Sequence, residues 1–159
     1  MAYVIEAFIA KKDVLKAAPL NVKFPIVSLP FDMALMPLDK NLLKSLGIER
    51  FLLQNYQEIL IDKKLDFIGK SISQSGNRVA FIQARMFAGF RGQACMVWEN
   101  GDRIRLEVSE NAINQAIEDI DDSILSASNI DEFECLNLGR FRYTDEWVEI
   151  AEIISPTNS

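Results

Sequence analysis

Carboxylates in the second half of the chain are the residues best suited to chemistry. Nine acidic residues lie between Glu107 and Glu134, and no lysine or arginine interrupts them. They are Glu107, Glu110, Glu118, Asp119, Asp121, Asp122, Asp131, Glu132 and Glu134. The other 14 of the 23 acidic residues share the rest of the chain with all 17 basic ones. Carboxylates at this density can bind a cation, transfer protons or present a negative surface to a basic partner.

The spacing of these acids does not match a calcium-binding loop. Asp119, Asp121 and Ser123 begin like one, but Ile124 stands where the loop requires glycine and Ile130 where it requires glutamate. A loose magnesium site formed by Asp119, Asp121 and Asp122 is an alternative. We expect no metal and no cofactor.

Catalytic arrangements are also missing from the sequence. The chain has no histidine, which removes the commonest general base and every Ser-His or Cys-His pair. Cys95 and Cys135 stand apart, and the apolar run around Cys95 is typical of a buried free thiol in a reducing cytoplasm. We predict that the protein is not an enzyme. A small carboxylate enzyme is an alternative, which requires a pocket holding a carboxylate of raised pKa.

Charge and hydropathy narrow the range of partners. The net charge of −6 and pI near 4.7 oppose binding to nucleic acid, despite the short basic and aromatic run from Arg140 to Tyr143. Apolar stretches are far shorter than the ~20 residues that cross a bilayer. The segment from Met1 to Lys12 lacks a leading basic region and is interrupted by Glu6, so we expect a strand there and a cytoplasmic protein.

The hydropathy pattern predicts a single α+β domain over residues 1–155, with a short tail at 156–159. Its expected strands are residues 3–10, 26–29, 33–36, 78–87, 94–98 and 102–108. Its expected helices cover residues 11–18, 39–47, 49–62, 109–120 and 144–154, with Asp39, Ser109 and Thr144 at three of the starts. Because the strands cluster centrally, we expect one antiparallel sheet with helices packed on it. The glycine-bearing segment 87–93 fits a hairpin turn with Arg91 exposed at its tip.

Two motifs resemble a family of small bacterial proteins. The first runs from Phe87 to Ala94 (FAGFRGQA) and is followed by Val97-Trp98 and by the segment 113–116 (INQA). The second runs from Asp131 to Arg140 (DEFECLNLGR) and is followed by Tyr143-Thr144 and Trp147. The family pattern is aromatic-Gly-Gly-x-Gly-x-Gln and Asp-Glu-Phe-x-x-Leu-Gly-Leu-Gly-Arg, then Thr-x-x-Trp. Ala88 and Asn137 stand where that pattern has glycine.

The resemblance covers roughly residues 67–147 and implies a binding function that involves no catalysis. Proteins that look like this are found among immunity proteins encoded beside polymorphic or contact-dependent toxins. It implies a protein that binds and neutralises a cognate toxin, which we expect to have a basic surface. The residues that we expect to contact it are Glu118, Asp119, Asp121, Asp122, Asp131, Glu132 and Arg91. A regulatory or scaffold module in a housekeeping complex is the alternative, and the acidic stretch is then a solvated surface that keeps the protein soluble.

Overall fold

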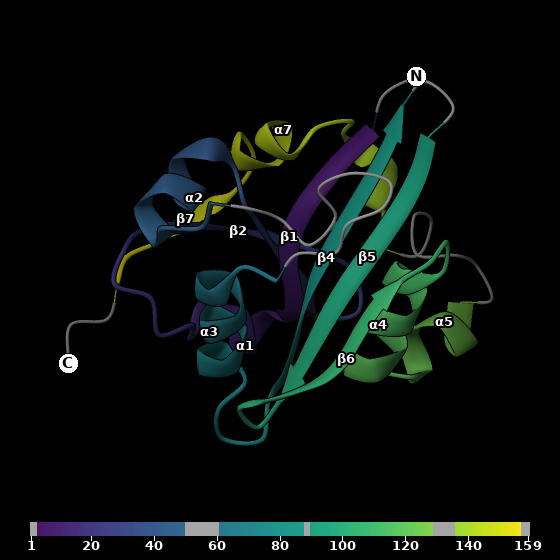
Figure 1. The fold of residues 1–159 in the computed structure, drawn as a ribbon, viewed down its shortest axis with the longest axis horizontal. Helices are drawn as coiled ribbons and strands as arrows, with labels where there is room; N and C mark the ends of the chain where they lie inside the picture. Colours follow the sequence, from purple (N-terminus) through teal and green to yellow (C-terminus); the bar gives the residue numbers. More distant parts are fainter. Residues whose placement is uncertain (1–2, 50–60, 88–89, 129–135, 157–159) are drawn as a thin grey trace.

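One antiparallel sheet organises the chain. The computed structural model describes residues 3–49, 61–87, 90–128 and 136–156, with only the backbone for residues 87, 90–91 and 126–128. Within these residues, seven strands pair in the order β6-β5-β4-β1-β3-β2-β7, and helices pack against the sheet (Figure 1). This confirms the predicted α+β class.

The strands and helices have the following bounds. The strands are β1 Tyr3–Lys11, β2 Phe24–Ser28, β3 Met33–Pro37, β4 Arg78–Phe87, β5 Phe90–Glu99, β6 Asp102–Val108 and β7 Glu152–Ile154. The helices are α1 Lys12–Lys16, α2 Lys40–Leu46, α3 Lys63–Ile72, α4 Ala112–Ile120, α5 Ser123–Ser128 and α7 Thr144–Val148, with a 3-10 turn, η1, at Leu138–Arg140.

Both faces of the sheet are buried. Along β4, Val79 and Phe81 belong to one apolar core, while Ala80 and Ile82 belong to the other, because successive side chains point to opposite faces. Helices α1, α2 and α3 contribute to the first core, and α4, α5 and α7 contribute to the second. Burial on both faces explains why the central strands are almost continuously apolar in sequence.

Local signals placed some helix ends correctly. The side chain of Asp39 accepts a hydrogen bond from the Leu42 N–H at 2.9 Å, so it caps α2 as predicted. Gly47 ends that helix with φ at +73°, a conformation that glycine adopts without strain. Helix α4 begins after Asn111 rather than at Ser109, whose hydroxyl instead accepts the Asn111 N–H.

Two helix predictions need correction, and two helices were not predicted. The expected helix over residues 49–62 lies mostly outside the described residues, but the residues described at its two ends are not helical. Asp62 instead caps α3, a helix that was not predicted. The expected helix over 144–154 ends at Val148, because the chain then forms β7, which pairs with β2. The short α5 was also not predicted.

Candidate functional site

The acidic residues at the end of α4 are positioned by the helix that carries them. Four residues of α4, Ala112, Ile113, Ala116 and Ile117, are buried against the sheet. The buried Gln93 side chain of β5 accepts the Ile113 N–H at 3.1 Å and fixes the first turn. Glu118 is exposed, and the last turn of α4 contains no basic residue. Figure 1 shows α4 and α5 together beside β6, at one side of the sheet.

Asp119 is held by an arginine of the sheet. The Arg105 guanidinium on β6 donates to both carboxylate oxygens of Asp119, at 2.5 and 3.2 Å, and to Glu107 at 3.2 Å. Arg78 of β4 also donates to the Asp119 backbone carbonyl. Asp119 therefore ties the end of α4 to the sheet edge, which is a structural task that the sequence did not reveal.

Asp121 is likewise bound within the chain. Its carboxylate pairs with the Lys11 ammonium at 2.6 Å and accepts the hydroxyl and backbone N–H of Ser123 at 2.6 and 3.0 Å. The Lys11 and Ser123 hydrogen bonds lower the pKa of Asp121 to about 2. The acid is thus ionised under all physiological conditions and anchors the turn between α4 and α5 to β1.

The predicted contact residues therefore divide into groups. Glu118 and Asp122 are exposed near the end of α4. Asp119 and Asp121, beside them, form ion pairs with Arg105 and Lys11. Asp131 and Glu132 lie outside the described residues. Arg91 lies within β5, opposite Met86 of β4, rather than at the tip of a hairpin turn over residues 87–93 as predicted, because β5 begins at Phe90; only the backbone of Arg91 is described. A negative surface is thus presented by Glu118 and Asp122, on a frame fixed by the other two acids.

A second polar site, which the sequence analysis missed, lies on β1 and β4. Glu6 is only 6% exposed, and its Oε1 accepts the Arg85 Nε and Nη2 at 3.3 and 3.1 Å. The Glu6 backbone N–H donates to the Thr144 hydroxyl at 3.1 Å, which links β1 to α7. Burial raises the pKa of Glu6, although the charge and hydrogen bonds of Arg85 oppose this shift. The one signal in the sequence was a glutamate within an otherwise apolar strand.

This ion pair borders a hollow of about 400 Å³. Apolar side chains and charged groups line it together, namely Val4, Glu6, Leu38, Lys40, Leu43, Arg85, Tyr143, Thr144 and Asp145. The hollow meets the condition that the enzyme alternative required, a pocket with a carboxylate of raised pKa. However, the Glu6 carboxylate already pairs with Arg85, so its chemistry in this structure is that of a buried ion pair.

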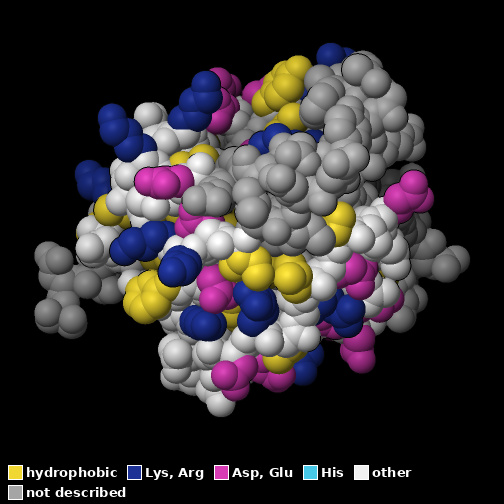
Figure 2. All heavy atoms as spheres, in the orientation of Figure 1, with side chains coloured by type: hydrophobic (Ala, Val, Ile, Leu, Met, Phe, Trp, Pro, Cys, Tyr) yellow, Lys and Arg dark blue, Asp and Glu magenta, His cyan; other side chains and the backbone are white. Residues whose placement is uncertain are grey.

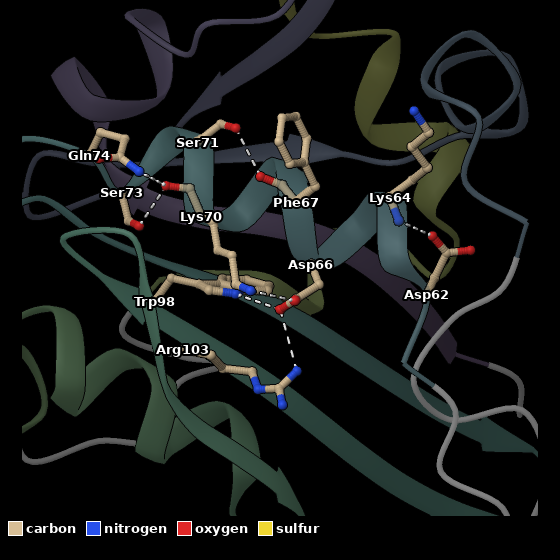
Figure 3. A network of polar contacts seen from close by, with 10 residues as sticks. All are labelled: Asp62, Lys64, Asp66, Phe67, Lys70, Ser71, Ser73, Gln74, Trp98 and Arg103. Carbon is tan, nitrogen blue, oxygen red and sulfur yellow. Dashed lines mark hydrogen bonds and ion pairs between the residues drawn. The ribbon is translucent and has the colours of Figure 1, made fainter.

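A third polar cluster holds α3 to the sheet (Figure 3). Asp66 of α3 accepts the Trp98 indole N–H at 3.0 Å and pairs with Arg103 at 3.3 Å and Lys70 at 3.2 Å. Burial alone would raise the pKa of Asp66, but these hydrogen bonds and charges outweigh it and lower the pKa. The Asp66 carboxylate is thus bound by two residues of the sheet and one of its own helix, which makes its task structural.

The remaining candidate chemistry is limited. Cys95 is a free, buried thiol, and burial raises its pKa to about 12, which removes thiolate reactivity near neutral pH. Across the described part of the chain, histidine, cysteine and carboxylate side chains form no group of three able to hold a metal ion. In the same residues, no helix has the length and apolar character needed to span a membrane.

Comparison with models of protein families, with curated proteins and with solved structures gives no match for this chain. A functional assignment therefore depends on the chain's own residues.

Proposed function

We propose that this chain is a cytoplasmic immunity protein, which binds a cognate bacterial toxin through its acidic surface and blocks it. The observation that carries the proposal is the charge at the end of α4. Carboxylates at a helix C-terminus are disfavoured by the helix dipole, and no described residue forms an ion pair with Glu118. A feature that costs stability and faces solvent is better explained by binding than by folding.

Electrostatics defines the partner that such a surface fits. Toxins that cleave nucleic acids carry basic clefts because their substrates are polyanions. An acidic surface can occupy such a cleft or bind beside it, and the opposite fields accelerate encounter. The ion pairs of Asp119 and Asp121 support this proposal, because they fix the position of the exposed acids before the partner arrives.

The test is co-expression with the protein encoded directly upstream, scoring cell survival and co-purification. The informative variant is Glu118→Lys with Asp122→Lys, because both side chains are exposed. Reversing Asp119 or Asp121 would break the ion pairs with Arg105 and Lys11 and disturb the fold. Its matched control is Glu149→Lys with Glu152→Lys, which makes the same charge change on exposed residues around β7. Glu152 forms only a surface pair with Lys16 at 3.5 Å, which contributes little to stability.

We expect wild type and the control variant to rescue the cells and to form a stable complex with the toxin. The α4 variant should weaken both the rescue and the complex. Full rescue by the α4 variant would refute the acidic surface as the binding site. An upstream product that is neither toxic nor bound would favour a regulatory or scaffold module instead.

A second candidate is a small ligand-binding or catalytic protein that uses the Glu6 hollow. The observation that favours it is the buried carboxylate of raised pKa at a hollow that also contains Lys40 and Asp145. Thermal shift against a metabolite library separates the two candidates. A ligand that stabilises wild type but not Lys40→Ala would support the hollow as a binding site.

A further inference from the structure

Strand β6 forms one edge of the sheet and exposes apolar side chains. Ile104, Leu106 and Val108 are 46%, 40% and 39% exposed, so all three of these apolar side chains reach the solvent. Leu106 and Val108 lie opposite the buried Met96 and Ala94 of β5, so they continue an apolar face. Figure 2, in the orientation of Figure 1, shows hydrophobic atoms on this face in the area of β5 and β6, with charged side chains around them.

The backbone of β6 has hydrogen-bonding groups that point away from the sheet. The Ser109 N–H donates to the Gln93 carbonyl at 3.2 Å, and the pairing with β5 is regular from Val108 to Arg105. Because backbone groups alternate in direction along a strand, Arg105 and Glu107 also face β5, whereas Leu106 and Val108 face outward. Among the described strands, β6 has a neighbour on one side only.

A register shift between Val97 and Trp98 of β5 leaves Ile104 without a paired residue, so the regular part of this edge is residues 105–108. Within it, Leu106 and Val108 are the residues whose backbone groups face outward. A second copy paired antiparallel about Leu106 places Leu106 opposite itself and Ile104 opposite Val108. The same register places Arg105 opposite Glu107 twice, so opposite charges meet on both sides of the two-fold axis. The alternative register centred on Arg105 would place two arginines opposite each other, which is unfavourable.

We infer that β6 pairs with β6 of a second copy of this chain, forming a symmetric dimer with one continuous sheet. The partner is a second copy of this chain because, in this register, the segment places apolar residues opposite apolar residues and Arg105 opposite Glu107. Residues 104–108 contain one arginine and one glutamate, so the contact is neutral although each chain carries a net charge of −6. The two-fold axis lies perpendicular to the sheet, so both α4 helices lie on the same face of the dimer.

The contact is small, because it joins five residues from each chain. Interfaces of this size give weak complexes, with dissociation constants on the order of micromolar. We therefore expect a dimer whose fraction rises between low-micromolar and submillimolar protein. The measurement needs no toxin, so its result is independent of the proposed function.

Sedimentation velocity of wild type, Leu106→Lys and Ile153→Lys tests the contact. Ile153 is 54% exposed on β7, the opposite edge strand, and serves as the matched control. We expect wild type and Ile153→Lys to dimerise and Leu106→Lys to remain monomeric. A wild type that stays monomeric, or a dimer that survives Leu106→Lys, would overturn the inference.

Oxidative crosslinking tests the register. In a Cys135→Ser background, the substituted residues of Leu106→Cys in the two copies lie opposite each other. Their Cα atoms are about 5.5 Å apart, a separation that suits a disulfide. Val108→Cys lies about 14 Å from its symmetry mate in the same register, which is too far. Crosslinking of the first variant alone is expected. Efficient crosslinking of the second alone would overturn this register.

Discussion

Gly69→Ala tests how α3 sits on the sheet. Gly69 lies in the middle of α3, where alanine normally stabilises a helix by about 1 kcal/mol relative to glycine. Here a Cβ would lie 2.3, 2.4 and 2.5 Å from the Cδ2, Cε2 and Cε3 atoms of Trp98. The indole cannot easily retreat, because it is fully buried, lies 6.0 Å from the Phe8 ring and donates to Asp66.

The expected cost follows from these contacts. Overpacking a buried site costs roughly 1 to 3 kcal/mol, and three contacts against a fixed ring place this case near about 3 kcal/mol. Subtracting the helix preference leaves a net destabilisation of about 2 kcal/mol. For a chain of this length that corresponds to a fall in melting temperature of about 4 to 8 °C.

Urea unfolding, followed by circular dichroism, measures the change in the free energy of unfolding. In a Trp98→Phe background the smaller ring leaves more room, so Gly69→Ala should cost less than it does beside Trp98. A Gly69→Ala variant more stable than wild type would show that α3 does not pack on Trp98 as described. An equal cost in both backgrounds would show that the indole is not the obstacle.

The ionisable groups and the buried thiol give three further predictions. The raised pKa of Glu6 means that wild type loses stability as pH rises from about 4.5 through that pKa, and Glu6→Gln should lack this slope in pH-dependent urea unfolding. Asp121 has its pKa lowered from 3.8 to about 2, so it stabilises the fold above 3.8 and loses this effect as the pH falls toward 2. The full pKa shift corresponds to a contribution of about 2.4 kcal/mol to the free energy of unfolding. Because Lys11 is partly exposed and solvent screens the pair, we expect Asp121→Asn to lower the free energy of unfolding by about 1 kcal/mol at neutral pH. Equal stability of the variant and wild type would show that the ion pair does not stabilise the fold. Cys95 should react with a thiol reagent at pH 8 only on unfolding, measured in a Cys135→Ser variant, and fast labelling of folded protein would contradict its burial.

The sheet was largely predictable from sequence, because its strands are local patterns. The apolar segments 78–87 and 102–108 and the turn at Asn100-Gly101 predicted β4, β6 and the β5–β6 connection. Helix α3 was not predicted, although it is amphipathic, and a glycine, Gly69, stands in its middle. That glycine is explained by the close approach of Trp98, which is 29 residues away in sequence and cannot be inferred locally.

The candidate site was predictable only in its charge. The acidic stretch is visible in the sequence, and Glu118 and Asp122 are exposed in the structure. The pairing of Asp121 with Lys11 joins residues 110 positions apart, and Glu6 meets Arg85 across 79 positions. Such ion pairs depend on strand register and helix placement, so sequence alone could not separate anchoring acids from presented ones.

The central claim is that the exposed acids near the end of α4 bind a basic toxin. Its most direct test is calorimetric titration of the toxin with wild type, Glu118→Lys/Asp122→Lys and Glu149→Lys/Glu152→Lys at low and high salt. We expect the α4 variant to bind at least about tenfold more weakly at low salt, with a shallower salt dependence, while the control matches wild type. Equal affinities and equal salt dependence for all three proteins would contradict the claim.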